Sequence, residues 1–123
     1  MHEMAICQSL LAEVGRVAAE HPATVVTRVS VSVGPLSGVE AALLTRAFDL
    51  ARLGTVADGA VLEIEQMPVT IWCDACGIES RVEANTLVCG GCGGWRVTVR
   101  SGDELLLKRV ALVELPQQQR ASG

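Results

Sequence analysis

The residues best suited to chemistry are four cysteines arranged as two C-x-x-C-G turns. Cys73 and Cys76 form the first pair and Cys89 and Cys92 the second, with twelve residues between the pairs. Each turn brings two sulfur atoms together, and the glycine that follows it relieves the tight backbone. Zn²⁺ prefers four such ligands in a tetrahedron at about 2.3 Å. The spacing therefore predicts one zinc ion held by all four thiolates.

We expect this zinc to be structural rather than catalytic, because four thiolates leave no position for an activated water. Iron in place of zinc, or a redox function of the cysteine pairs, is the alternative. A redox pair is typical of a helix start, whereas both pairs here lie in glycine-rich, hairpin-like sequence. The segment between them has few large aliphatic residues, so we expect its folding to depend on the ion.

The N-terminus offers a second set of metal ligands. The chain begins Met1-His2-Glu3, and His2 is one of only two histidines. A free α-amine, the deprotonated amide of residue 2 and the His2 imidazole can close fused rings around one metal ion. An all-nitrogen planar set of this kind favours Ni(II) or Cu(II). The alternative is an exposed histidine in a frayed first helical turn.

Two helices and three strands are expected to position these residues. Apolar residues recur every three or four positions between residues 3 and 20, which predicts a helix that ends near His21, since Pro22 follows it. Residues 24–33 alternate as in a half-buried strand, with one side formed by Val25, Thr27, Val29, Val31 and Val33.

A second helix is predicted after residue 36. Ser37 followed three residues later by Glu40 is typical of a capping box, and Gly54 is typical of a helix end. Further strands are predicted from about residue 60 toward Trp72, despite Pro68, and from about 105 to 115. The predicted inward face of the helix consists of Leu43, Leu44, Ala47, Phe48, Leu50 and Ala51.

These elements predict an α+β fold: a small mixed three-stranded sheet with two helices on one face, plus an inserted zinc-ribbon-like module. The insert covers 73–100, and the main lobe covers 1–72 and 101–123. Because the insert leaves and returns through the last two strands, we expect these to pair antiparallel, and the first two to be parallel. The tail from residue 116 should be frayed.

Charge and composition limit the possible partners. The net charge is −4, from 14 acidic and 10 basic side chains, so neither nucleic acid nor a membrane surface is an expected partner. No signal peptide or membrane-spanning run is present in the sequence. Together with the odd number of cysteines, five, this predicts a soluble cytoplasmic protein with reduced thiols.

The sequence resembles the nickel-insertion accessory proteins of [NiFe]-hydrogenase maturation, usually called HypA. The resemblance covers nearly the whole chain. It rests on the two C-x-x-C pairs before a final aliphatic strand, on Met1-His2-Glu3-Met4 with Cys7 in the following helix, and on Val33-Gly34 before Ser37-Gly38-Val39-Glu40. The second pair of the family commonly reads Cys-Pro-x-Cys, whereas this chain has glycine at both middle positions, which alters turn rigidity but not the ligand set.

The resemblance implies a nickel lobe and a zinc lobe. It implies nickel held by the Met1 amine, backbone nitrogens near the start and the His2 imidazole, with Glu3 in the same site. The implied partners are a maturation GTPase, usually called HypB, and the large subunit of the hydrogenase. We therefore predict a nickel metallochaperone with Ni²⁺ as cargo and Zn²⁺ as a structural ion. We interpret Glu40 as a helix-capping residue and Cys7 as a residue that packs in the core.

Two other functions compete with this prediction. A zinc ribbon that binds nucleic acid is the main alternative, because Arg81, Arg96 and Arg100 lie in or beside the insert. The acidic total and the lack of interleaved aromatic residues argue against it. An enzyme is also disfavoured. The two histidines allow no Ser-His-Asp set, and the sequence contains no G-x-x-x-x-G-K phosphate loop.

Overall fold

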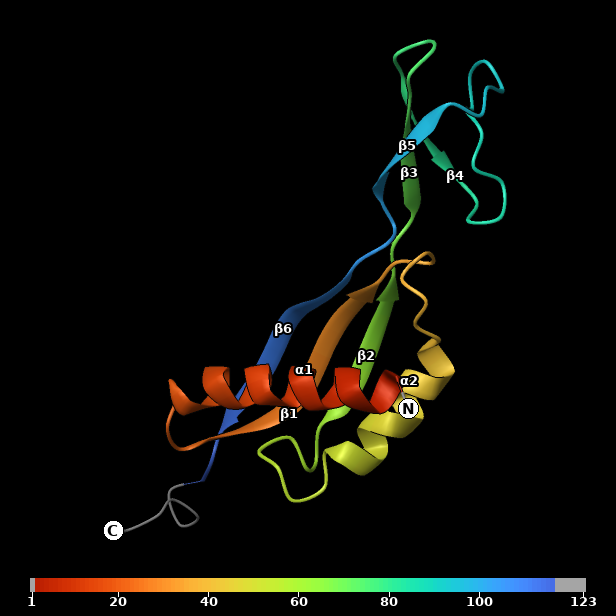
Figure 1. The fold of residues 1–123 in the computed structure, drawn as a ribbon. Helices are drawn as coiled ribbons and strands as arrows, with labels where there is room; N and C mark the ends of the chain where they lie inside the picture. Colours follow the sequence, from red (N-terminus) through yellow and green to blue (C-terminus); the bar gives the residue numbers. More distant parts are fainter. Residues whose placement is uncertain (1, 117–123) are drawn as a thin grey trace. The chain divides into compact units, whose positions relative to one another are not determined.

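The computed structural model describes residues 2–116, so Met1 and nearly all of the tail predicted to be frayed lie outside the described residues. Figure 1 shows the chain order of the elements: α1 (His2–Ala19), β1 (Thr24–Val33), α2 (Ala41–Ala51), β2 (Val61–Gln66), β3 (Val69–Cys73), β4 (Glu79–Val82), β5 (Val97–Ser101) and β6 (Leu105–Glu114). The predicted α+β class is confirmed.

The described residues divide into two compact units. We call residues 2–31, 40–63 and 107–116 the helical unit, and residues 32–39 and 64–106 the cysteine unit. Both helices belong to the helical unit. All four cysteines of the two C-x-x-C turns belong to the cysteine unit, together with the sheet β4-β3-β5.

The larger sheet has the strand order β2-β1-β6. In Figure 1, β1 and β2 point the same way and β6 runs opposite to them, which makes the sheet mixed, as predicted. Two backbone hydrogen bonds frame the antiparallel pair, from Gly34 to Glu104 at 2.8 Å and from Leu115 to Ala23 at 2.8 Å. The expected pairing of the second and last strands is wrong, because β1 lies between them.

β1 is the central strand of this sheet and the most buried of its three strands. Its last five residues, 29–33, are all buried, so side chains on both faces of the strand are covered there. The predicted alternation holds only in part. Val26 is buried while Val25 and Thr27 are exposed, and two successive exposed residues, Thr27 and Arg28, shift the alternation before Val29.

The strand predicted from residue 60 toward Trp72 is in fact two strands. β2 ends at Gln66 and β3 begins at Val69, with Pro68 in the break. Proline cannot donate a ladder hydrogen bond, so the chain leaves one sheet there and enters the other. In the second sheet β3 is central and antiparallel to both neighbours, with Trp72 opposite Glu79 in β4 and Thr98 in β5.

The helices form where their periodicity predicts. The buried residues of α1 are Cys7, Leu10, Leu11 and Val14, one stripe at helical spacing. Figure 1 shows α1 crossing the sheet, with α2 beside it. None of the helices within residues 2–116 is long and apolar enough to cross a membrane.

The prediction of the second helix is corrected in two respects. Glu40 itself is the N-cap residue, and its side chain makes no capping hydrogen bond. The Ser37 hydroxyl instead accepts a hydrogen bond from the Val39 amide at 3.2 Å. The prediction of a capping box is therefore wrong. Leu43 and Leu50 are 42% and 66% exposed, although they were predicted to face inward. An eleven-residue helix buries only a narrow stripe, formed here by Leu44 and Phe48.

Candidate metal centres

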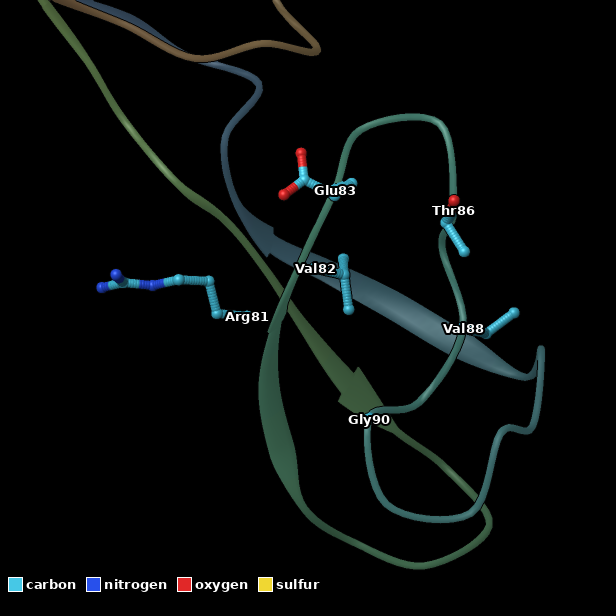
Figure 2. Close-up of a pocket in the computed structure, with 6 residues that line it drawn as sticks. All are labelled: Arg81, Val82, Glu83, Thr86, Val88 and Gly90. Carbon is cyan, nitrogen blue, oxygen red and sulfur yellow. The ribbon is translucent and has the colours of Figure 1, made fainter.

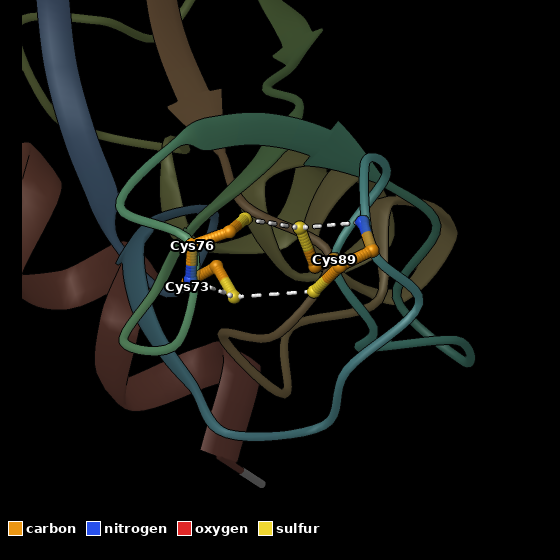
Figure 3. A group of neighbouring side chains, drawn as sticks. Cys73, Cys76 and Cys89 are labelled. Carbon is orange, nitrogen blue, oxygen red and sulfur yellow. Dashed lines mark hydrogen bonds between the residues drawn. The ribbon is translucent and has the colours of Figure 1, made fainter.

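The four cysteines converge from two turns of the cysteine unit. Their sulfur atoms all lie within 4.8 Å of one another. The Cys76 sulfur is 3.5 Å from that of Cys89 (Figure 3), and the Cys73 sulfur is 3.7 Å from that of Cys92. Ligands at the corners of a zinc tetrahedron with 2.3 Å bonds are separated by about 3.8 Å. The cluster therefore has the size that zinc requires.

The same backbone arrangement closes both turns. The amide of Gly77 donates to the Cys73 carbonyl and that of Gly93 to the Cys89 carbonyl, each at 2.9 Å. Both glycines have positive φ, 68° and 73°. Residues with a Cβ atom rarely adopt this conformation, so glycine after each C-x-x-C pair is a requirement of the turn.

Replacing Gly93 with alanine should weaken zinc binding by about 5- to 30-fold. The left-handed conformation costs an alanine about 1–2 kcal/mol, and the added methyl group meets no other atom within 4 Å. Competition with a coloured chelator measures the affinity. Gly15→Ala, in open space on α1, is the matched control and should leave it unchanged. Equal affinities for both variants and the unmodified chain would contradict the requirement for glycine.

Backbone amides are directed at three of the sulfur atoms. The Cys89 sulfur accepts hydrogen bonds from the amides of Gly91 at 3.3 Å and Cys92 at 3.4 Å. The Cys73 sulfur accepts one from Cys76, and the Cys92 sulfur accepts one from Gly94, both at 3.4 Å. Such donors stabilise thiolates, the form in which cysteine binds metal.

These hydrogen bonds set the acidity of two thiols. The amides of Cys92 and Gly91 lower the pKa of Cys89 to about 6. The hydrogen bond that Cys76 shares with the Cys89 sulfur raises the pKa of Cys76 to about 12. Because metal ions bind the thiolate form of cysteine, zinc binding removes the proton from Cys76.

The sequence did not reveal the amide donors or a contact that holds the second turn. The Gly90 amide donates to the Ser80 hydroxyl of β4 at 3.1 Å. The shallow pocket in Figure 2 lies beside this contact, lined by Arg81, Val82, Glu83, Thr86, Val88 and Gly90. Figure 2 shows the Arg81 side chain extending away from Thr86 and Val88, so the pocket has no convergent set of charged groups.

Three arginines favoured the alternative of nucleic-acid binding. Two of them lie over tryptophan rings. The Arg100 guanidinium lies 4.9 Å from the ring centre of Trp72, and that of Arg96 lies 5.8 Å from the ring centre of Trp95. These contacts are cation–π interactions. They give both arginines a local function within the cysteine unit.

The other candidate ligands lie at the start of α1 in the helical unit. The His2 Nδ1 atom is 3.8 Å from a carboxylate oxygen of Glu3, and the two side chains are 61% and 14% exposed. Met1, the third predicted ligand, lies outside the described residues. Glu3 also lines a shallow apolar groove between the helices, with Met4, Leu43, Arg46, Ala47 and Leu50.

Cys7 is buried in the helical unit, as its packing prediction requires. Its side chain is fully buried, and its thiol lies 3.5 Å from the Leu44 carbonyl, to which it donates. Burial, with a smaller effect from the charge of Glu3, raises the pKa of Cys7 to about 11. A protonated, buried thiol is a poor metal ligand.

Comparisons with known proteins agree on one family. Residues 1–112 match the family model described as "Hydrogenase/urease nickel incorporation, metallochaperone, hypA". The hydrogenase maturation factor HypA of Nitrosospira multiformis is 46% identical over 113 residues, which cover 92% of this chain and 98% of that one. The HypA of Aquifex aeolicus is 44% identical over 112 residues, 91% of this chain and 97% of that one.

Solved structures show the same likeness. The solution structure of the Ni metallochaperone HypA from Helicobacter pylori has a TM-score of 0.65 at 27% identity, covering 94% of this chain and 98% of that chain. A second solution structure of a HypA protein has a TM-score of 0.71 at 28% identity, covering 92% and 97%.

Proposed function

The chain belongs to the HypA family of nickel-incorporation metallochaperones, and from that premise we propose that it carries Ni(II) at its own N-terminus. The proposed ligands are the Met1 amine, backbone nitrogens at the start of the chain and the His2 imidazole, with Glu3 in the same site. The cargo is delivered for [NiFe]-hydrogenase maturation.

The observation that carries this proposal is the exposure of His2. Its side chain is 61% exposed, so a metal ion can reach the imidazole without unfolding the helix. The Glu3 carboxylate, 3.8 Å away, adds negative charge that favours a cation at this position. A site that is open to solvent suits a metal that must be handed on.

We propose further that Cys73, Cys76, Cys89 and Cys92 hold one resident zinc ion. Four sulfur ligands close its coordination sphere, so this ion maintains structure and is not exchanged as cargo. We propose residues 73–100 as the zinc-binding insert and residues 1–72 and 101–123 as the nickel lobe. Because reduced thiolates require a reducing compartment, we propose that the protein acts in the cytoplasm.

The protein is proposed to act through partners rather than as an enzyme. A maturation GTPase of the HypB kind and the hydrogenase large subunit are the proposed partners, and nucleic acid and membranes are not. The sequence has no phosphate-binding loop of its own. We therefore expect GTP turnover to come from the partner.

This division of labour can be tested with purified components. The zinc-loaded chain alone should release no phosphate from GTP above the background without protein. It should also form a complex with the maturation GTPase that gel filtration resolves. If the chain alone hydrolysed GTP, and if removing the chain with an antibody abolished that activity, the chain would itself be the enzyme.

A further inference from the structure

The four cysteine residues differ in exposure in a regular way. Cys73 and Cys89, the first cysteine of each turn, are 0% and 2% exposed. Cys76 and Cys92, the second cysteine of each turn, are exposed. The sulfur of each exposed cysteine lies against that of the buried cysteine of the other turn. Cys76 is 3.5 Å from Cys89 (Figure 3), and Cys92 is 3.7 Å from Cys73.

The two exposed cysteines differ in the hydrogen bonds that their sulfur atoms accept. The Cys92 sulfur accepts a hydrogen bond from the Gly94 amide at 3.4 Å. Among the hydrogen bonds of residues 2–116, no backbone amide donates to the Cys76 sulfur. An N–H donor withdraws electron density from a thiolate and so lowers its nucleophilicity. Within residues 2–116, Cys76 is therefore the exposed cysteine whose sulfur accepts no backbone hydrogen bond.

We propose that the cluster is a peroxide-sensitive zinc-release site, in which Cys76 is oxidised first and then forms a disulfide with Cys89. This inference rests on the proposed zinc site. It adds a reaction in which the oxidant is hydrogen peroxide and the product is a bond between the two turns. A bond within one C-x-x-C turn is not the first product.

The reaction proceeds in two balanced steps. The Cys76 thiolate attacks one peroxide oxygen, so that an S–O bond forms, the O–O bond breaks and hydroxide leaves, giving a sulfenic acid. The Cys89 thiolate then attacks the Cys76 sulfur, so that the S–S bond forms, the S–O bond breaks and a second hydroxide leaves. Together the two sulfurs lose two electrons to peroxide, and the hydroxides take up protons to become water.

The geometry favours the bond between turns over a bond within a turn. Cys73 and Cys89 each accept a hydrogen bond from the amide of the second cysteine of their own turn. A bond within a turn would pull these sulfurs out of that arrangement, whereas the 3.5 Å approach of Cys76 to Cys89 needs only a short movement. Zinc then loses two of its four thiolates and dissociates.

The test uses the zinc-loaded full chain and substoichiometric hydrogen peroxide. A metallochromic dye follows zinc release, and the remaining thiols are alkylated under denaturing conditions. Trypsin, which cleaves after Arg81 and Arg96, and a protease that cleaves before Asp74 then separate the cysteines. Cys73 lies on the peptide that ends at residue 73, Cys76 on peptide 74–81, and the second pair on peptide 82–96.

The expected first product is peptide 74–81 linked to peptide 82–96, with fragmentation placing the bond at Cys89 and with Cys73 alkylated. The buried Cys7 should also be found alkylated, which controls for general oxidation. Zinc release with bonds confined to single turns, or with Cys73 bonded first, would overturn the inference. Failure of peroxide to release zinc would do so too. A chain that holds no zinc before oxidation would instead refute the proposed zinc site.

Two matched variants test the order of attack. Histidine is a normal zinc ligand, so Cys76→His and Cys92→His should each retain a Cys₃His site. Peroxide-driven zinc release should be about tenfold slower from Cys76→His than from Cys92→His, because only the first variant lacks the sulfur that peroxide attacks first. Equal slowing by both would contradict the priority of Cys76. If either variant fails to load zinc, the peptide map of the unmodified chain decides.

Discussion

Replacing His2 with alanine should abolish tight nickel binding while leaving zinc in place. The change removes one nitrogen donor and the chelate ring that it closes. Removing a group that hydrogen-bonds to a metal ligand typically lowers metal affinity about 10- to 100-fold. Removing a ligand itself should therefore lower nickel affinity more than about 100-fold. Isothermal titration of the zinc-loaded chain with Ni²⁺ measures the effect. Because His2 is 61% exposed, the fold should be unaffected.

The second histidine supplies the matched control. His21 lies in the exposed turn after α1, outside the candidate nickel site. His21→Ala should therefore keep the original nickel affinity. Equal losses in the two variants would mean that nickel binding does not depend on the N-terminal imidazole. Acidification should also weaken binding to the unmodified chain, since protons compete with nickel for the nitrogen donors.

Stripping zinc should unfold the cysteine unit and leave the helical unit folded. The helical unit has its own core, which includes Val14, Leu44 and Phe48, all fully buried. The cysteine unit has a smaller core around Val69 and Ile71. In zinc-finger peptides the ion contributes roughly 10–16 kcal/mol to folding. A strong chelator should therefore have a large effect on one unit and a small effect on the other.

Two spectroscopic signals separate the units. Both tryptophans, Trp72 and Trp95, lie in the cysteine unit, and both helices lie in the helical unit. After chelation, the fluorescence of the half-buried Trp72 should shift toward that of an exposed indole, whereas Trp95 is already 74% exposed. Far-UV circular dichroism should keep its helical signal. Cys7→Ala is the control and should still bind one zinc per chain. Loss of both signals at the same chelator concentration would show that the units fold together.

The sequence predicts local features of this fold better than its long-range pairing. The helical stripe of α1 and the two glycine-closed turns follow from residue spacing alone. The place of β6 beside β1 could not be predicted in this way, because both free edges of a parallel pair accept an antiparallel strand. Leu43 and Leu50 illustrate a similar limit, since helical spacing does not say how wide the buried stripe is.

The two candidate sites differ in how far the sequence determines them. Four cysteines in two C-x-x-C-G turns define a tetrahedral ligand set without reference to any relative. The amides of Gly91 and Gly94 that donate to sulfur depend on the folded backbone and have no signal beyond the richness in glycine. For the N-terminal site, chelate chemistry favours either Ni(II) or Cu(II) and does not distinguish them. The family resemblance is what favours nickel.

The most direct test of nickel binding compares two forms of the chain by isothermal titration. One form begins at Met1 with a free α-amine, and the other carries an N-terminal extension that converts this amine into an amide. Both should contain one zinc per chain. The first should bind one nickel ion tightly, and the extended form should show no tight binding. Equal nickel affinity in the two forms would contradict the N-terminal site.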